Sequence, residues 1–253
     1  MKRLLYFLVL FWIIPAAIQI SAESQSSQTP VAECQEKGSV GYDVALQPEE
    51  DFTLTFAYYL PPCYQQNPAA AYPVLYLMGM DAQAPQMVAE LIRNHEIPPV
   101  ILIMPGTTII RSEYDEMIVT YLIPYVNAHL RIRQESQYRG IGGISHAAAI
   151  ASRVAFQAPG AFGKVAAISG GIDESEQEQF AAWIAATPRA DLPRVLIDIG
   201  DRDGSLLPYA NGLKNILSDR QVAYEFSMGQ GGHNWGYWGG RLKMYLLWFA
   251  KNW

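Results

Sequence analysis

The sequence contains, in order, a serine, an aspartate and a histidine that could act together in nucleophilic catalysis. The serine is the candidate nucleophile. Ser145 lies in Gly143-Ile-Ser145-His-Ala147, where a short predicted strand turns abruptly into a helix of small residues. This frame differs by one methyl group from the Gly-x-Ser-x-Gly turn, which lifts a serine onto a sharp corner within reach of a base. Because a serine hydroxyl is a poor nucleophile at neutral pH, the prediction depends on a base elsewhere in the chain.

His233 is the predicted base, because of the loop that carries it. Residues 229–235 form the glycine-rich run Gly-Gln-Gly-Gly-His-Asn-Trp between the last predicted strand and the last predicted helix. Glycines there allow the chain to carry an imidazole over the edge of a sheet. His146 is adjacent to the serine, but the next side chain in a tight turn points away from it. His95 and His129 are predicted to be surface residues.

The predicted acid lies between the serine and the histidine, in the order Ser, Asp, His. The run Gly200-Asp-Arg-Asp-Gly204 follows a predicted strand and offers Asp201 and Asp203, while Asp198 lies within that strand. An acid on this turn could reach the histidine and hold its tautomer. Spacing leaves both turn aspartates eligible, and the alternative for either is a solvated turn residue. The Asp-x-Asp-Gly run also resembles part of a calcium loop, but the later ligands are missing.

Acyl transfer by a serine also requires donors for the oxyanion of the tetrahedral intermediate, usually backbone N–H groups. The N–H of His146, directly after the serine, is the first candidate. The second is expected from the turn after an early strand, here Gly79-Met80. A dinucleotide-binding interpretation of Gly140-Ile-Gly142 fails, because Ser145 occupies the third glycine position of that motif.

The surrounding sequence alternates between predicted strands and helices, which indicates an α/β fold. Such alternation predicts a mostly parallel sheet with helices on both faces. The candidate residues all follow strands, so they should lie at the same edge of the sheet, where active sites form in such folds. No insertion large enough for a cap domain is evident. The predicted strands are 51–60, 72–78, 100–104, 139–144, 164–168, 194–199 and 223–227, and the predicted helices are 84–95, 113–130 with a bend at Pro124, 146–156, 173–186, 205–217 and 241–252.

Composition supports one sizeable core and excludes some classes of function. Half of the 253 residues are hydrophobic and 17% are charged, which argues against disorder. The net charge of −6 provides no basic surface for nucleic acid. Four histidines without a His-Glu-x-x-His or Cys-x-x-Cys pair leave little for a transition-metal site.

The N-terminus has the layout of a secretory signal peptide over residues 1–22. Lys2 and Arg3 precede an apolar run, and small residues follow it. A membrane anchor is the alternative, because the run is nearly long enough to span a bilayer. Pro15 and the polar segment after the run favour cleavage, which would leave no stable membrane span and an extracytoplasmic or secreted protein. Residues 23–33 are predicted to be a flexible linker, and residues 34–253 the folded domain.

Export changes how the two cysteines are interpreted. In an oxidising compartment Cys34 and Cys63 are predicted to form one disulfide. The closed loop would stabilise the fold by about 3 kcal/mol in the chain-entropy account. The alternative is two free thiols.

Several ordered motifs together resemble the esterase D-like branch of the α/β-hydrolases, which includes feruloyl esterases, enterochelin esterases and S-formylglutathione hydrolases. The resemblance covers roughly residues 54–253. The motifs are Tyr59-Leu-Pro-Pro-Cys-Tyr64, Tyr72-Pro-Val-Leu-Tyr-Leu77, Leu122-Ile-Pro-Tyr-Val126, Ile141-Gly-Gly-Ile-Ser145, Gly200-Asp-Arg-Asp203 and Gly232-His-Asn-Trp235.

The resemblance implies an α/β-hydrolase that acts as a serine esterase through an acyl-enzyme, on a small-molecule or glycan-linked ester and without a metal or organic cofactor. It implies Ser145 as nucleophile, His233 as base and Asp203 as acid. It also implies that the N–H groups of Met80 and His146 form the oxyanion hole.

Aromatic residues just past the histidine are candidates for substrate binding. Trp235, Tyr237 and Trp238 could line an acyl pocket, and the alternative is that they are core or lid aromatics.

Two departures from the family pattern motivate a different class of function. The family usually has Leu-Leu-His-Gly where this chain has Leu77-Met-Gly79, and Ser-x-Gly-Gly where this chain has Ser145-His-Ala-Ala148. A non-catalytic binding domain of the same fold is therefore one alternative. Acyl transfer to an alcohol by the same three residues is another.

Overall fold

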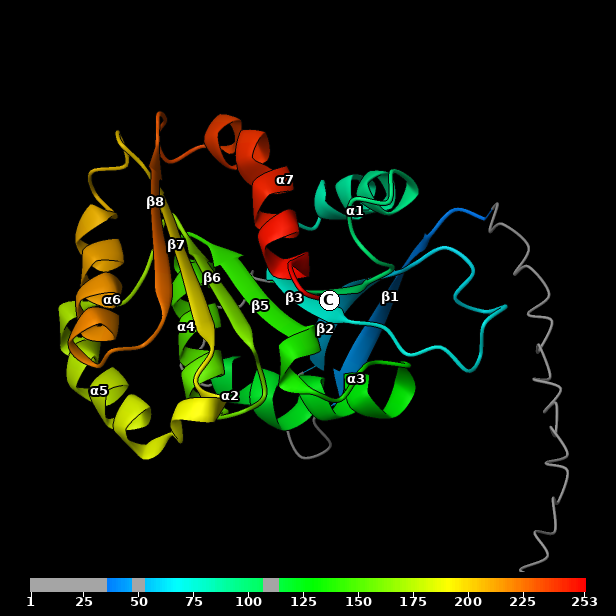
Figure 1. The fold of residues 1–253 in the computed structure, drawn as a ribbon, viewed down its shortest axis with the longest axis horizontal. Helices are drawn as coiled ribbons and strands as arrows, with labels where there is room; N and C mark the ends of the chain where they lie inside the picture. The colour runs from blue at the N-terminus through cyan, green and yellow to red at the C-terminus, as the bar shows by residue number, and fades with distance from the viewer. Residues whose placement is uncertain (1–35, 47–52, 107–113) are drawn as a thin grey trace, which may run out of the picture. The chain divides into compact units, whose positions relative to one another are not determined.

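A mostly parallel sheet forms the centre of the protein in the computed structural model, which describes residues 36–46, 53–106 and 114–253. Within these ranges eight strands pair in the order β1-β2-β4-β3-β5-β6-β7-β8. The strands from β4 to β8 in this order run parallel, whereas β1 and β2 pair antiparallel (Figure 1). The strands are β1 (Ser39–Leu46), β2 (Thr53–Leu60), β3 (Val74–Met78), β4 (Ile101–Pro105), β5 (Arg139–Ile144), β6 (Lys164–Ile168), β7 (Arg194–Gly200) and β8 (Tyr224–Gly229).

The prediction of an α/β fold with a mostly parallel sheet is confirmed, but one strand was not predicted. Strand β1 pairs along its whole length with β2, from Ser39 opposite Leu60 to Leu46 opposite Thr53. Its sequence contains Gly41 and Asp43, which are weak strand formers and conceal the alternation.

The predicted signal peptide (1–22), the linker (23–33) and Cys34 lie outside the described residues, so these predictions remain predictions. Among the described residues, no helix combines the length and apolar character that crossing a membrane requires.

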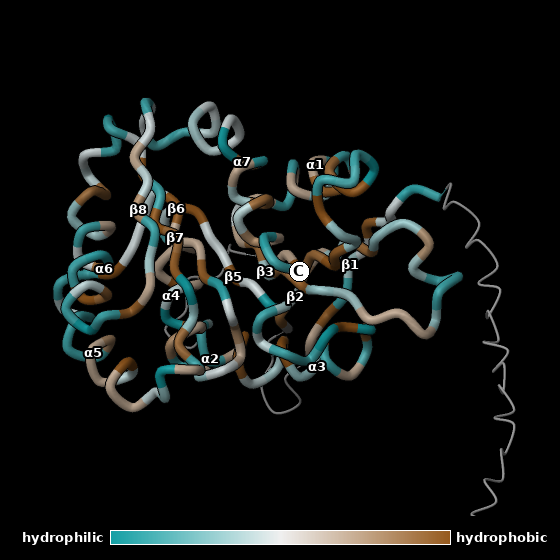
Figure 2. Tube along the Cα trace, in the orientation of Figure 1, coloured by the Kyte–Doolittle hydropathy of each residue, from teal (hydrophilic) through white to brown (hydrophobic). Residues whose placement is uncertain are grey.

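Helices cover both faces of the sheet. One face is covered by α1 (Ala84–Arg93) and α7 (Trp235–Ala250), whose buried residues share a core with alternate residues of the strands. In Figure 2 hydrophilic and hydrophobic residues alternate along the helices, as burial of a single helix face requires. The opposite face is covered by α2 (Tyr114–Met117), a π-helical turn (Ile118–Leu122), α3 (Ile123–His129), α4 (His146–Gln157), α5 (Gln177–Ala186) and α6 (Leu207–Asp219).

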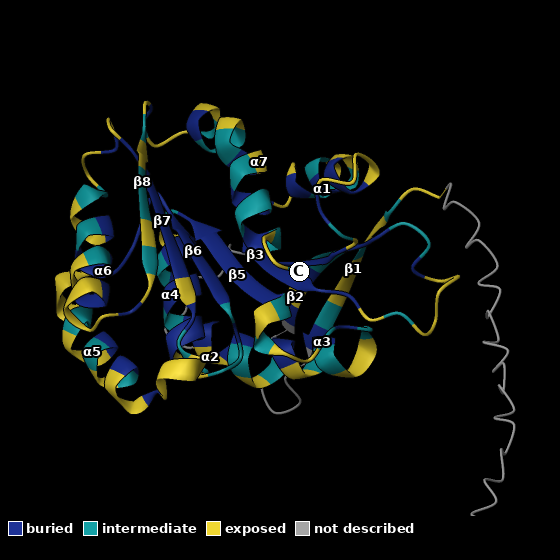
Figure 3. Cartoon of the chain, in the orientation of Figure 1, coloured by how far each residue is buried: buried dark blue, intermediate teal, exposed yellow. Residues whose placement is uncertain are grey.

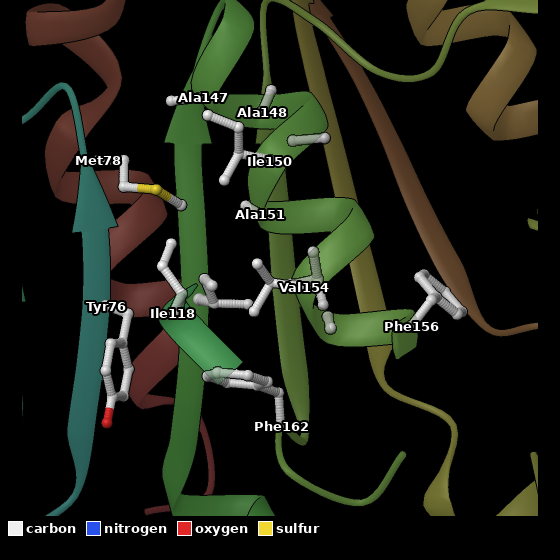
Figure 4. Packing of buried hydrophobic residues seen from close by; sticks show 14 of the residues in the cluster. Tyr76, Met78, Ile118, Ala147, Ala148, Ile150, Ala151, Val154, Phe156 and Phe162 are labelled. Atoms are coloured by element: carbon white, nitrogen blue, oxygen red, sulfur yellow. The ribbon is translucent and has the colours of Figure 1, made fainter. Parts of the chain in front are cut away.

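The central strands are buried on both faces, as their continuous apolar sequences predict (Figure 3). In β3, Tyr76 and Met78 belong to the core beneath α4, while Leu75 and Leu77 belong to the core beneath α7. Figure 4 shows the first of these cores, where Ala147, Ala148 and Ala151 bring α4 close to the sheet. The small side chains of α4 therefore fix the position of the helix that follows Ser145.

The predicted helix 113–130 is divided into three parts. The N–H of Ile123 donates to the carbonyl of Ile118, which is a π-helical hydrogen bond. Pro124 follows directly and has no N–H, so a regular α-helical ladder cannot continue through this point. The bend predicted at Pro124 is therefore taken up by a wide turn just before it.

Helix α7 begins at Trp235 and not at residue 241 as predicted. The side chain of Asn234 caps its first turn by accepting a hydrogen bond from the N–H of Tyr237 at 3.2 Å. Gly236, Gly239 and Gly240 are weak helix formers, and they made this stretch resemble a loop. Trp235 and Trp238 are consequently residues of the first helical turns, directly after His233.

Two buried polar contacts fix α7 against the sheet. Near its start, the buried Asp198 of β7 accepts hydrogen bonds from Tyr237 (2.8 Å), Tyr245 (2.7 Å) and the guanidinium of Arg241 (2.7 Å). At its other end, the ammonium of Lys164 donates to the carbonyl of Phe249 at 2.6 Å. A cation at a helix C-terminus is favourable because the last carbonyls have no partners within the helix.

Candidate active site

Ser145, His233 and Asp203 meet at the carboxyl edge of the sheet. Ser145 Oγ is 2.9 Å from His233 Nε2, and His233 Nδ1 is 3.0 Å from Asp203 Oδ2. The serine follows β5, the aspartate follows β7 and the histidine follows β8. Because a carboxylate can only accept, Nδ1 carries the proton in this arrangement and Nε2 is left to accept from the serine hydroxyl. The structure thus brings these three sequence-predicted residues into one hydrogen-bonded chain.

Ser145 lies on a strained turn between β5 and α4. Its backbone has φ 62° and ψ −126°, a conformation that costs a residue with a side chain about 1–3 kcal/mol. The turn is held by hydrogen bonds from Ser145 N to Ile168 O (2.8 Å) and from Ala148 N to Ser145 O (2.9 Å). The surrounding fold therefore imposes the conformation that presents the hydroxyl to His233.

The methyl groups of Ala147 and Ala148 fit into this turn because glycines face them. A Cβ added to Gly143 would lie 2.2 Å from the carbonyl oxygen of Ala147, so this position cannot carry a side chain. A Cβ on Gly170 would lie 2.9 Å from the Cβ of Ala148. The glycines at positions 143 and 170 thus leave room for the two alanines that depart from the family's Ser-x-Gly-Gly pattern.

The two turn aspartates, which spacing alone could not separate, have different contacts. Asp203 is buried and its Oδ2 accepts from His233. Asp201 is exposed and its Oδ1 accepts from the N–H of Gly231 at 2.9 Å. Asp203 therefore contacts the imidazole, whereas Asp201 braces the loop that carries it.

The loop before His233 is fixed by close backbone contacts. Gly231 has φ 158°, and a Cβ there would lie 2.4 Å from the ring of Tyr237. Its carbonyl accepts from Arg202 N at 2.8 Å.

The two histidines predicted to be surface residues, His95 and His129, are exposed, and His129 stacks on Tyr125 at 4.0 Å between ring centroids.

The backbone N–H groups of Met80 and His146 are the candidates for an oxyanion site. Met78 pairs with Gly143, so the turn after β3 continues beside the turn that carries Ser145. Consistent with this register, a Cβ on Gly79 would lie 3.7 Å from that of Ile144. Within the described residues neither N–H donates to another backbone or side-chain group. The His146 side chain is exposed.

The three aromatic residues that were candidates for lining an acyl pocket lie in different environments. Tyr237 is buried with its hydroxyl on Asp198, so the suggestion that it lines an acyl pocket was wrong. Trp235 and Trp238 are half-buried, with ring centroids 6.3 Å apart. The Trp238 ring lies perpendicular to the His233 imidazole at 4.8 Å between centroids.

Ser169 is a site residue that the sequence analysis missed. Its Oγ accepts a hydrogen bond from Trp238 Nε1 at 2.8 Å. The predicted strand 164–168 ends just before Ser169, and no role was predicted for the residues that follow it. The place of Ser169 after a parallel strand, at the edge where Ser145 lies, was the available signal.

Within the described ranges, no three His, Cys, Asp or Glu side chains are grouped as a metal site requires.

The parallel sheet, the flanking helices and the serine turn after β5 define the α/β-hydrolase fold, and no large cap domain is inserted between the described strands. A solved ferulic acid esterase has the same fold, with a TM-score of 0.73 and 21% identity over 85% of this chain and 99% of that one. S-formylglutathione hydrolase from Staphylococcus aureus superposes with a TM-score of 0.61 and 18% identity over 85% of this chain and 98% of that one.

Sequence comparison assigns the family. The model of the family described as "Putative esterase" matches residues 51–249, so the chain belongs to this esterase family and is a carboxylic ester hydrolase. An uncharacterized protein of Corynebacterium glutamicum is 24% identical, over 94% of this chain and 68% of that protein.

Proposed function

We propose that the protein is a secreted serine esterase, with Ser145 as nucleophile, His233 as general base and Asp203 as the acid that orients the histidine. The observation that carries the proposal is the hydrogen-bond chain of 2.9 Å and 3.0 Å through these three residues. Its position at the carboxyl edge of a parallel sheet and on a strained serine turn supports the same assignment.

In the proposed reaction, Ser145 Oγ attacks the ester carbonyl carbon while its proton passes to His233 Nε2. Asp203 accepts a hydrogen bond from the Nδ1–H group of His233 and stabilises the imidazolium that forms. The backbone N–H groups of Met80 and His146 donate to the oxyanion of the tetrahedral intermediate. The alcohol leaves with the proton from Nε2, and water then attacks the acyl-enzyme by the same proton transfers in reverse order.

The direct test is covalent labelling by a fluorophosphonate probe. The folded wild-type protein should be labelled, and Ser145→Ala should lose labelling and at least about 10⁴-fold of kcat/KM for p-nitrophenyl acetate. Ser218→Ala, which removes an exposed hydroxyl at the end of α6, is the matched control and should retain both activities. Folded wild-type protein that is neither labelled nor active would instead support a non-catalytic domain.

The substrate class requires a panel of esters. The similarity to a ferulic acid esterase makes esters of aromatic acids the first candidates, and the half-buried ring of Trp235 is a candidate surface for such a group. Preference for feruloyl over butyryl esters would support this choice. Product analysis in the presence of an alcohol separates hydrolysis from acyl transfer.

Secretion and a Cys34–Cys63 disulfide complete the proposal. Expression with the native N-terminus should yield an exported protein that begins near residue 23. A thiol reagent should label the denatured protein only after reduction. Labelling without a reductant would contradict the disulfide.

A further inference from the structure

We infer that Trp238, held by Ser169, is a positioning residue that keeps the His233 imidazole aligned between Ser145 and Asp203. This inference deepens the proposed function and rests on it. It assigns Trp238 a role different from the substrate contact that its place in the sequence suggested.

His233 needs support from outside its own loop. The two residues before it are Gly231 and Gly232, which provide no side chains to pack against the ring. The imidazole is 37% exposed, so solvent borders much of its surface. Trp238 lies perpendicular to this ring at 4.8 Å between centroids, which is within the range of edge-to-face aromatic packing. The indole therefore occupies space into which the imidazole would otherwise rotate.

Trp238 is itself fixed by Ser169. The indole Nε1 donates to Ser169 Oγ at 2.8 Å. Ser169 is fully buried at the end of β6, and its N–H donates to Asp198 O at 2.7 Å. The acceptor for the indole thus directly follows a central strand and is hydrogen-bonded to the next one.

The backbone of Ser169 gives a second reason to assign its hydroxyl a role. Its φ of 47° lies in the left-handed region, which glycine adopts more readily than serine. Gly170 and Gly171 follow directly, so the turn is otherwise built from glycine. A serine at the left-handed position provides the oxygen that Trp238 needs, which a glycine would not.

Two single variants and their combination test the inference by steady-state kinetics with p-nitrophenyl acetate. Trp238→Phe keeps an aromatic ring but removes the N–H, and Ser169→Ala removes the acceptor. Each should lower kcat about tenfold with KM changed less than twofold, because small displacements of a catalytic group reduce the rate of the chemical step. The double variant should be no worse than either single variant, since both remove the same hydrogen bond.

Trp248→Phe is the matched control on the same helix. The Trp248 indole Nε1 donates to Glu225 Oε1 at 2.9 Å, far along α7 from His233. This variant also removes an indole hydrogen bond from α7, and it should leave kcat and KM unchanged. If Trp238 instead contacts substrate, Trp238→Phe will raise KM and leave kcat unchanged, and the inference is wrong.

A spectroscopic measurement tests the same inference without turnover. The proton shared by His233 and Asp203 should give a far-downfield proton resonance in wild-type protein and in Trp248→Phe. Exchange should broaden this resonance in Trp238→Phe and in Ser169→Ala. An unchanged resonance in both would overturn the inference, even if the wild-type protein were not labelled by fluorophosphonate and the proposed function failed.

Discussion

Asp198 within β7 and Asp203 just after it are both buried carboxylates, but their partners differ. Asp198 accepts from Arg241, Tyr237 and Tyr245, so both of its oxygens are hydrogen-bonded. Asp203 accepts from His233 through Oδ2, and its Oδ1 has no donor among the described residues. A buried charge without compensating partners is costly, so the second arrangement needs a different explanation from the first.

The difference separates a carboxylate that stabilises the fold from one that is poised for chemistry. Within the part of the chain that the structure describes, all side-chain partners of Asp198 lie on α7, so its hydrogen bonds attach that helix to the sheet. Among the described residues, the only side-chain partner of Asp203 is an imidazole that also contacts Ser145. When that imidazole gains a proton during the proposed reaction, it becomes positively charged. The incompletely bonded Asp203 carboxylate then has a cationic partner, which it lacks at rest. Substitutions at the two sites should therefore have opposite consequences.

The largest effect is expected for Asp203→Asn. The amide cannot hold Nδ1 in its protonated tautomer or stabilise the imidazolium, so kcat should fall by about 10³–10⁴-fold. Urea denaturation should show a stability close to that of wild type, because Asn fills the same space. A large loss of stability with activity per folded molecule preserved would reverse the roles of the two carboxylates.

Asp198→Asn should mainly reduce stability. It removes the charge opposite the Arg241 guanidinium, whose side chain is only 26% exposed. Breaking such a pair should lower the free energy of unfolding by about 3 kcal/mol. The kcat of the folded protein at low temperature should stay within about threefold of wild type. A loss of kcat comparable to that of Asp203→Asn would show that Asp198 belongs to the catalytic machinery.

The stability of the protein at alkaline pH tests the contacts that the phenols of Tyr237 and Tyr245 make with Asp198. Burial, and then the adjacent Asp198 carboxylate, raise the pKa of Tyr237 and of Tyr245 above the ordinary value of 10. Above pH 10 the unfolded chain releases these protons while the folded protein retains them. The stabilisation is therefore complete below pH 10 and is lost as the pH rises. Each phenol contributes about 1.4 kcal/mol per pH unit to this decline.

Tyr245→Phe isolates one of these contributions. Urea denaturation between pH 9 and 11 should show a decline in stability that is shallower than in wild type by about 1.4 kcal/mol per pH unit above pH 10. The same decline in both proteins would mean that Tyr245 does not retain its proton in the fold.

The sequence predicted the central sheet well because burial on both faces leaves a direct pattern. The bounds of β5 and β6 agree with prediction, since apolar or glycine runs end at clear turns. Strand β1 and the start of α7 were missed because glycines there contradict local propensity, and tertiary contacts decide the outcome. Pro124 has no N–H, so the sequence predicts a bend in the helix at this point. It does not specify that the bend takes the form of a π-helical turn.

The candidate site was predictable to the extent that the order of motifs determines it. The order of Ser145, Asp203 and His233 along alternating strands predicted that they would share one edge, and the structure brings them together. The hydrogen bond between Ser169 and Trp238 joins residues that are 69 positions apart, so no local pattern could indicate it. The choice between Asp201 and Asp203 depends on side-chain directions within a single turn, which spacing does not contain.

The smallest effect is expected for that remaining carboxylate, Asp201. Asp201→Asn keeps an oxygen that can accept from Gly231 N, so kcat should stay within about twofold of wild type. Asp201→Ala removes the acceptor and loosens the loop before His233, so kcat should fall about fivefold, as expected for the loss of one partly buried hydrogen bond. Parallel steady-state assays of these variants and Asp203→Asn decide between the two turn aspartates. If Asp201→Asn is the variant that loses 10³-fold or more, then Asp201 is the acid and the contact at Asp203 only supports the loop.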